Sequence, residues 1–121
     1  MDQKLREEVV QLHAELCGGL ADPNRILILY ALSRCNSNVS DLARRIGLPQ
    51  PRVSRHLKIL RECGLVEAHR DAQSIHYRIT DRRIIEALDL LRAVLASRLK
   101  DQAPLVRTVG QALSTGKEPG E

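Results

Sequence analysis

The sequence predicts a mainly α-helical domain with one two-stranded β-hairpin, in the order α-α-α-α-β-β-α. Three observations lead to this fold class. Leucine-rich stripes recur at helical spacing along most of the chain. One short segment instead alternates apolar and polar residues, which is the pattern of a half-buried strand. Phe and Trp are absent and only two tyrosines occur, so the core must consist of aliphatic side chains, which suits helices packed on helices.

The first two helices are predicted from apolar spacing and from residues that start and stop helices. Gly18 and Gly19 end the first helix. Asp22 and Pro23 then read as an N-cap followed by proline at the first helical position, so a second helix runs from there to about Cys35. The apolar stripe of the first helix has spacings of four, three and four residues and consists of Leu5, Val9, Leu12 and Leu16.

A third and a fourth helix follow with a very short connection between them. Asn38 can cap the third helix and Gly47 terminates it. Only residues 48–50 separate it from the fourth helix, which extends to Gly64. At 100° per residue, one core-facing stripe of this helix consists of Val53, Leu57 and Leu60.

After Gly64 the period of the pattern changes. Residues 75–79 alternate apolar and polar side chains, residues 65–70 are the expected partner strand, and residues 71–74 form the turn. Asp81 then caps a long last helix. Its apolar stripe includes Leu88, Leu91, Leu95 and Leu99.

This order is that of a winged helix–turn–helix with an extra helix at each end. We expect residues 1–101 to form one DNA-binding and dimerisation domain, and residues 102–121 to form a weakly ordered tail. The stripes of the first and last helices exceed what a domain of this size must bury alone, so we expect a second copy to cover them across a two-fold axis. The alternative is that both stripes pack within the single chain.

The positive charge is confined to one part of the sequence. The formal net charge is +4, and residues 41–63 hold six basic and two acidic side chains, so the other residues sum to zero. A charge run is often only a solvated face, but this concentration favours a polyanion partner. The lack of aromatic residues argues against a stacking platform for single-stranded nucleic acid.

The fourth helix is the expected DNA-reading element. Arginine can bind guanine with two hydrogen bonds in the major groove, and the N-terminal end of such a helix faces the bases. Arg44 and Arg45 of the third helix are expected to contact phosphates, and Arg70 with His69 near the hairpin tip either adds backbone contacts or is simply solvated. The expected contacts on the fourth helix are Gln50, Arg52, Ser54, Arg55, His56 and Lys58.

These segments resemble the ArsR/SmtB family. The resemblance rests on LADPNR at 20–25, VSDLA at 39–43, QPRVSRHLKILRECGLV at 50–66 and IHYRI at 75–79, and it covers roughly residues 8–100. It implies a prokaryotic homodimeric repressor that binds an inverted repeat in double-stranded DNA near its own operon. It also implies release by an inducer, often a metal, a metalloid or a thiol-reactive species.

The inducer sites common in that family are missing here. The Cys-x-Cys positions of the third helix are Asn38 and Ser40, and Asp81 is followed by Arg83 where metal sensors of the family carry histidine. The residue one turn before Cys63 is Ile59 rather than a second cysteine. The resemblance therefore predicts the mode of action without predicting the ligand.

Three cysteines remain as candidate inducer residues: Cys17, Cys35 and Cys63. An odd number of cysteines without a CxxC pair predicts free thiols rather than disulfides or a zinc site. As(III) or another thiophilic ion needs two or three converging thiolates, so tertiary or dimer contacts would have to assemble the site. Cys17 is the best-placed candidate, because some arsenic sensors of the family use a cysteine there with a thiol from the other protomer. Two alternatives stay open: small buried hydrophobes, or thiols that respond to oxidation or persulfidation.

Other classes of protein fit the sequence less well. A small thiol enzyme is disfavoured because CxxC and a phosphate-binding glycine loop are both absent, so we expect no enzyme activity. A winged-helix protein-interaction module is the second rival, and it predicts binding that is insensitive to salt. The sequence lacks an apolar signal segment and a run of about 18 apolar residues, so we expect a cytoplasmic protein without membrane contact.

Overall fold

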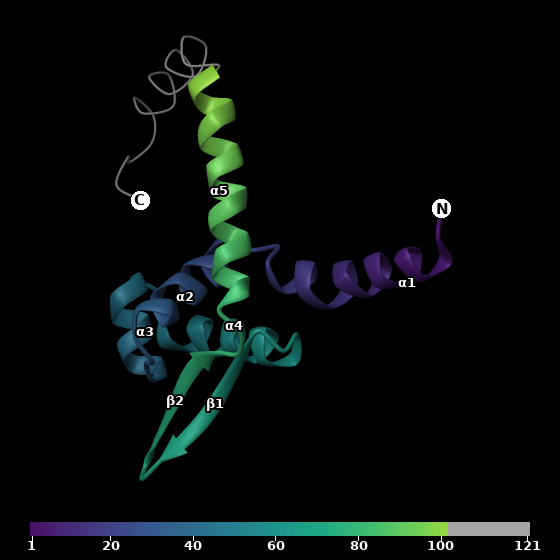
Figure 1. Cartoon of the computed structure of the whole chain (residues 1–121). Helices are drawn as coiled ribbons and strands as arrows, with labels where there is room; N and C mark the ends of the chain where they lie inside the picture. Colours follow the sequence, from purple (N-terminus) through teal and green to yellow (C-terminus); the bar gives the residue numbers. More distant parts are fainter. Residues whose placement is uncertain (102–121) are drawn as a thin grey trace. The chain divides into compact units, whose positions relative to one another are not determined.

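The computed structural model describes residues 1–101, and it has the predicted order of elements (Figure 1). The expected tail, 102–121, lies outside the described residues. The chain divides into two units, Met1–Ile85 and Glu86–Glu121. The elements are α1 (Gln3–Leu12), η1 (His13–Cys17), α2 (Pro23–Arg34), α3 (Val39–Ile46), α4 (Gln50–Glu62), β1 (Val66–Asp71), β2 (Ser74–Ile79) and α5 (Arg83–Asp101). The predicted mainly α-helical fold with a two-stranded wing is confirmed.

Side-chain caps define where the helices begin. The Asp22 carboxylate accepts a hydrogen bond from the backbone N–H of Asn24 over 2.8 Å, and the Asn38 side chain accepts one from Asp41 N–H over 2.8 Å. Gly47 ends α3 with a φ of +80°, in the left-handed region that glycine tolerates. Pro49 precedes α4 and makes no side-chain cap. α4 therefore starts on the fixed φ of proline rather than on a hydrogen bond.

The hydrophobic core of the first unit lies between α2, α3, α4 and the start of the hairpin. The stripe predicted for α4 is confirmed, because all three of its side chains are at most 1% exposed. The other buried aliphatic side chains of these elements are Ile28, Leu29, Leu32, Leu42, Leu65 and Val66. Burying side chains of this size stabilises the fold by about 1.5–3 kcal/mol each, which fixes the relative positions of the three helices.

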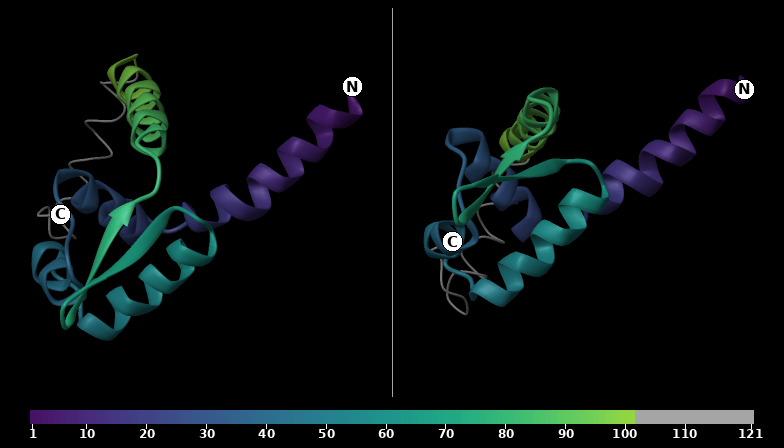
Figure 2. Two further views of the ribbon diagram at one scale, coloured as in Figure 1. Left: turned by 60° about the horizontal axis from the view of Figure 1, so that its bottom comes forward. Right: turned by 90° about the horizontal axis from the view of Figure 1, so that it is seen from below.

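The hairpin is antiparallel, and it is joined to the helices by a contact that the sequence did not predict. Its register pairs Val66 with Ile79 and Asp71 with Ser74. β1 contacts α4, while β2 contacts α2 and α3 (Figure 2). In addition, Ser37 and Tyr77 exchange two backbone hydrogen bonds, so the segment between α2 and α3 forms a one-residue bridge with β2. The helices and the wing are thus linked through the backbone.

The first helical segment differs from the prediction in two ways. Its second part, η1, is a π-helix, so the apolar stripe does not keep one α-helical register to its end. No residue of α1 or η1 is buried. Leu5, Val9 and Leu12 are 44–52% exposed, and Leu16 is 37% exposed. The stripe of the first helical segment therefore has no cover within Met1–Ile85.

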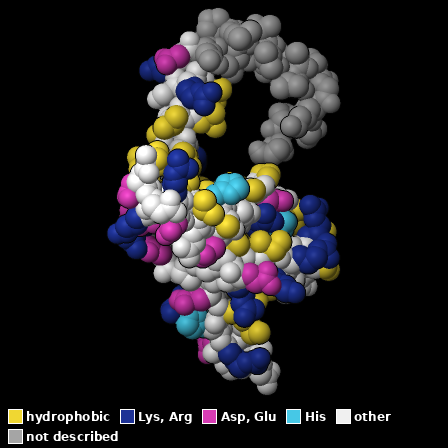
Figure 3. Space-filling view, turned by 90° about the vertical axis from the view of Figure 1, so that its right-hand side faces the viewer, with side chains coloured by type: hydrophobic (Ala, Val, Ile, Leu, Met, Phe, Trp, Pro, Cys, Tyr) yellow, Lys and Arg dark blue, Asp and Glu magenta, His cyan; other side chains and the backbone are white. Residues whose placement is uncertain are grey.

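The apolar stripe of the last helix, α5, is also exposed over much of its length. Leu88 is buried, whereas Leu91, Leu95 and Leu99 remain 43–63% exposed. Figure 3 shows hydrophobic side chains reaching the surface among charged ones. Among residues 1–101, the helices are too short or too polar to cross a lipid bilayer.

Candidate DNA-binding site

α4 presents two chemically different faces. Val53, Leu57 and Leu60 point into the core, and on the other side the side chains of Arg52, Ser54, Arg55 and Lys58 are exposed. The core stripe fixes the rotation of the helix, so these four side chains are held outward together. An exposed helix with this chemistry matches the width and the donor and acceptor groups of the DNA major groove.

Gln50, at the start of α4, is held by the preceding helix. Its side-chain Nε2 donates to Ser40 Oγ over 2.7 Å, and both residues are exposed. Because one amide hydrogen of Gln50 is engaged in this way, its Oε1 and its second amide hydrogen stay available. Gln50 lies at the end of α4 that helix–turn–helix proteins direct toward base edges.

The two arginines of α3 have different surroundings. Arg44 is exposed and pairs with Asp41 one turn earlier on the same helix. Arg45 is also exposed, but its Nη2 donates to the carbonyl oxygen of Ala31 on α2 over 2.7 Å. Exposed pairs of this kind contribute little to stability, so either guanidinium can exchange its partner for a phosphate at small cost.

His56 lies at the edge of the exposed face, in a position that the sequence did not explain. It is half-buried, and its Nδ1 is 3.4 Å from Nη1 of Arg25 on α2. Arg25 also donates to the carbonyl oxygens of Gly19 (2.7 Å, from Nε) and Gly18 (3.3 Å, from Nη2). Arg25 belongs to the LADPNR segment at 20–25, but its contact with His56 could not be predicted because the two residues are 31 positions apart in the sequence.

The carboxylate that caps α2 lies in the same surroundings. Burial alone would raise the pKa of Asp22, but the Asn24 N–H bond and the charge of Arg25, together with that of His56 in its protonated form, hold it below its ordinary value. An ionised Asp22 therefore lies within electrostatic reach of Arg25 and His56.

The wing carries a small charge cluster. Arg78 Nε donates to Glu67 Oε2 over 2.6 Å across the hairpin, and His69 Nε2 is 3.4 Å from the same oxygen. Hydrogen bonds from Arg78 and His69 lower the pKa of Glu67. The His69 side chain is thus engaged by the Glu67 carboxylate. Arg70, nearer the tip, is exposed and opposite Ile75.

The three thiols lie in different environments. Cys17 and Cys35 are exposed, so the interpretation of Cys35 as a small buried hydrophobe is wrong. Cys63 is half-buried, and its Sγ lies close to Gly19. Within residues 1–101, His, Cys, Asp and Glu side chains nowhere gather in threes that could hold a metal ion.

A short turn between α3 and α4, an exposed basic face on α4 and an adjoining two-stranded wing define the class of a winged helix–turn–helix DNA-binding transcription regulator. Residues 22–68 match the family described as bacterial regulatory protein, arsR family. The chain belongs to this family and is a DNA-binding transcriptional repressor of the ArsR/SmtB type, not an enzyme.

Three similar proteins illustrate the relationship. The nodulation protein NolR of Rhizobium meliloti is 33% identical over 104 residues, which are 84% of this chain and 85% of that protein. A probable mercury resistance operon repressor of Streptomyces lividans is 36% identical over 77 residues, 64% of this chain and 62% of that protein. The solution structure of a homodimeric winged helix–turn–helix DNA-binding domain from Mycobacterium bovis superposes with a TM-score of 0.71 at 26% identity, covering 84% of this chain and 93% of that one.

Proposed function

We propose that this repressor reads double-stranded DNA with α4 and adds phosphate contacts from α3 and the wing. The observation that carries the proposal is the exposed basic face of α4, which is held outward by the buried stripe behind it. The base-reading residues are Gln50, Arg52, Ser54, Arg55, His56 and Lys58, and the phosphate contacts come from Arg44, Arg45 and Arg70.

We further propose that the repressor acts as a homodimer on an inverted repeat, in the cytoplasm, near its own operon. The exposed apolar stripe of α1 and η1 supports this, since it has the composition of an interface and finds no cover within the first unit. Leu91, Leu95 and Leu99 of α5 complete the proposed interface, whereas Leu88, which the sequence also placed there, is already buried in the single chain and is left out. A two-fold axis then repeats α4, so that two half-sites are read about one helical turn of DNA apart.

The test is DNA binding as a function of salt, using a duplex that the wild-type protein selects from a random pool. Affinity should fall steeply as salt rises, because Lys and Arg release counterions from the phosphates. Arg55→Ala should weaken binding sharply and leave the dimer folded. Arg34→Ala, which removes the same charge from the exposed end of α2, is the matched control and should bind like wild type.

Two outcomes would overturn the proposal. Normal binding by Arg55→Ala would remove α4 from the reading role. Selection of no duplex, with partner binding that is insensitive to salt, would instead favour a protein-interaction module.

We propose a thiophilic ion or a thiol-reactive species as the inducer. The exposure of Cys17 and Cys35 supports thiol chemistry, and one relative is named for mercury resistance. Because residues 1–101 of one chain bring no three metal-binding groups together, a bound ion such as As(III) would need thiolates from both protomers, with Cys17 the first candidate and Cys63 the last.

A gel shift tests this, with arsenite, cadmium, mercury(II), zinc and a persulfide donor added in turn to the protein–DNA complex. Release by one of them should be lost in the variant that replaces all three cysteines with serine. If none releases the DNA, or if the cysteine-free variant responds like wild type, the thiols are structural and the regulator is independent of metal.

A further inference from the structure

We propose that Arg25 is a positioning residue for DNA binding: it fixes His56 as a neutral imidazole that donates from Nε2 on the reading face of α4. The inference rests on the proposed role of α4 and assigns a task to a residue outside that helix.

The first step is the anchoring of the Arg25 guanidinium. Nε donates to the Gly19 carbonyl oxygen over 2.7 Å, and Nη2 donates to the Gly18 carbonyl oxygen over 3.3 Å. Two hydrogen bonds from a rigid planar group to two successive carbonyls determine its position and its plane. The third nitrogen, Nη1, is thereby directed at one place rather than rotating freely.

The second step is the identity of the group that receives Nη1. His56 Nδ1 lies 3.4 Å from it. A guanidinium has five N–H donors and no acceptor, so His56 Nδ1 must accept. The imidazole proton therefore sits on Nε2, and the ring is neutral in this contact.

The third step is what the Nε2–H can reach. His56 is four residues after Arg52, so the two side chains are neighbours on one side of α4. A donor beside Arg52 can bond to a phosphate oxygen or to O6 or N7 of guanine. In the other tautomer, the same atom would be an acceptor that faces a polyanion. The tautomer thus decides whether His56 attracts or repels DNA.

The Gly18–Gly19 segment, which binds the Arg25 guanidinium, is itself held by residues that follow α4. Gly19 is buried, and a Cβ placed on it would lie 3.0 Å from Cys63 Sγ and 2.9 Å from Leu65 Cδ1. The Gly18–Gly19 segment is therefore held by the chain that follows α4, and through Arg25 it orients a side chain in the middle of the same helix.

The first experiment reads the tautomer directly. Long-range ¹H–¹⁵N spectra of the four histidines, recorded at a pH of about 8 so that imidazoles are neutral, should show the Nε2–H form for His56. The His56→Gln spectrum assigns the signal. In Arg25→Gln, which cannot span the three acceptors, the signal should move toward a mixture of tautomers.

The second experiment is a double-mutant cycle on the duplex selected by the wild-type protein. Arg25→Gln should weaken binding about tenfold, the size of one hydrogen bond to a charged or polar partner. A glutamine at position 56 would place a side-chain amide N–H near the position of the imidazole Nε2, whether or not Arg25 is present. His56→Gln should therefore keep most of the affinity that His56→Ala loses, and Arg25→Gln should cost less than about twofold in the His56→Gln background.

The possible results distinguish the proposed role of Arg25 from a purely structural role and from the DNA-reading role of α4. An Nδ1–H tautomer of His56 in the wild type would overturn the proposal, even if Arg25→Gln fails to fold. Equal costs of Arg25→Gln in both backgrounds would also overturn it, since Arg25 would then act only through folding. A protein that selects no duplex but shows the Nε2–H signal would contradict the DNA-reading role while leaving the Arg25–His56 geometry intact.

Discussion

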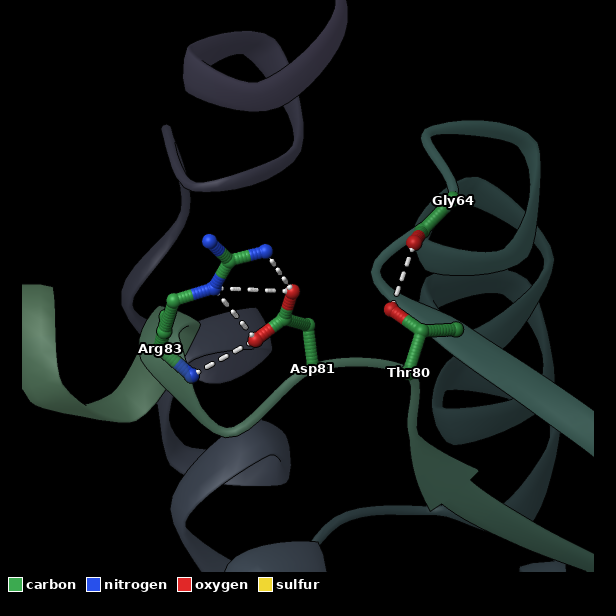
Figure 4. Close-up of polar contacts among 4 residues, drawn as sticks. All are labelled: Gly64, Thr80, Asp81 and Arg83. Atoms are coloured by element: carbon green, nitrogen blue, oxygen red, sulfur yellow. Dashed lines mark hydrogen bonds and ion pairs between the residues drawn. The ribbon is translucent and has the colours of Figure 1, made fainter.

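Thr80 and Gly64 join the end of the wing to the end of α4. The Thr80 hydroxyl donates to the Gly64 carbonyl oxygen over 2.7 Å (Figure 4). The Thr80 backbone N–H also donates to the Leu65 carbonyl oxygen over 3.2 Å. Gly64 has a φ of +76°, so its carbonyl is turned out of the helical direction and is available to this donor.

Replacing Thr80 with valine should lower the free energy of unfolding by about 0.5–1.5 kcal/mol, because the shape is kept and only the side-chain hydrogen bond is lost. Urea denaturation at a fixed protein concentration measures the difference. Thr80→Ser retains the hydroxyl and is the control. A valine variant as stable as the serine variant would show that water replaces the bond without cost.

Gly19→Ala should destabilise the fold by about 1–3 kcal/mol, because the added methyl group would meet two side chains at the core. The contacts are 2.9 Å to Leu65 and 3.0 Å to Cys63. Gly18→Ala is the matched control. Gly18 has helical backbone angles, and a Cβ there would make only an ordinary contact, 3.9 Å from the His13 carbonyl oxygen, so alanine there should stabilise by up to about 1 kcal/mol. Thermal unfolding of the two variants should therefore shift in opposite directions.

Ala72→Gly should stabilise the wing by a few tenths to about 1 kcal/mol, because Ala72 has a φ of +57° and a left-handed backbone disfavours a Cβ. The residue lies in the turn between the paired residues Asp71 and Ser74. Ala68→Gly, within β1, should destabilise instead. Urea midpoints of both variants give the test, and a destabilised Ala72→Gly would contradict it.

The cap of α5 should make stability depend on pH in the acid range. Hydrogen bonds from the Arg83 guanidinium and backbone N–H lower the pKa of Asp81 from 3.8 to about 2 (Figure 4). A lowered folded-state pKa adds stability that is complete above the unfolded value and is lost as the pH falls toward 2. The difference in unfolding free energy between wild type and Asp81→Asn should thus be constant above a pH of about 5 and shrink below it. A difference independent of pH would contradict the ion pair.

The pattern of residues in the sequence was sufficient for the order of the main helices and strands and for the exposed face of α4. Helix starts at Asp22 and Asn38 could be predicted because a cap is local: the side chain bonds to an N–H two or three residues later. The orientation of α4 followed from its stripe, since the helical period alone decides which side chains are buried.

The remaining features depend on contacts between distant residues, which no local pattern encodes. The Arg25–His56 contact joins positions 31 residues apart, and the Ser37–Tyr77 bridge is made by backbone groups that every residue carries. The π-helical turn at η1 also escaped prediction, because one extra residue in a turn leaves the composition unchanged. The exposure of Cys35 was missed for the opposite reason: free cysteines are usually buried.

The two backbone hydrogen bonds between Ser37 and Tyr77 link the wing to the helix–turn–helix, and we expect them to hold the two as one stiff piece. A stiff piece cannot release DNA by folding its own parts away from the groove. In the proposed two-fold dimer, control would then act on the separation of two such pieces, which must match the repeat of the double helix. An inducer would then change the distance between the two copies of α4 and leave the structure of each winged helix–turn–helix unchanged.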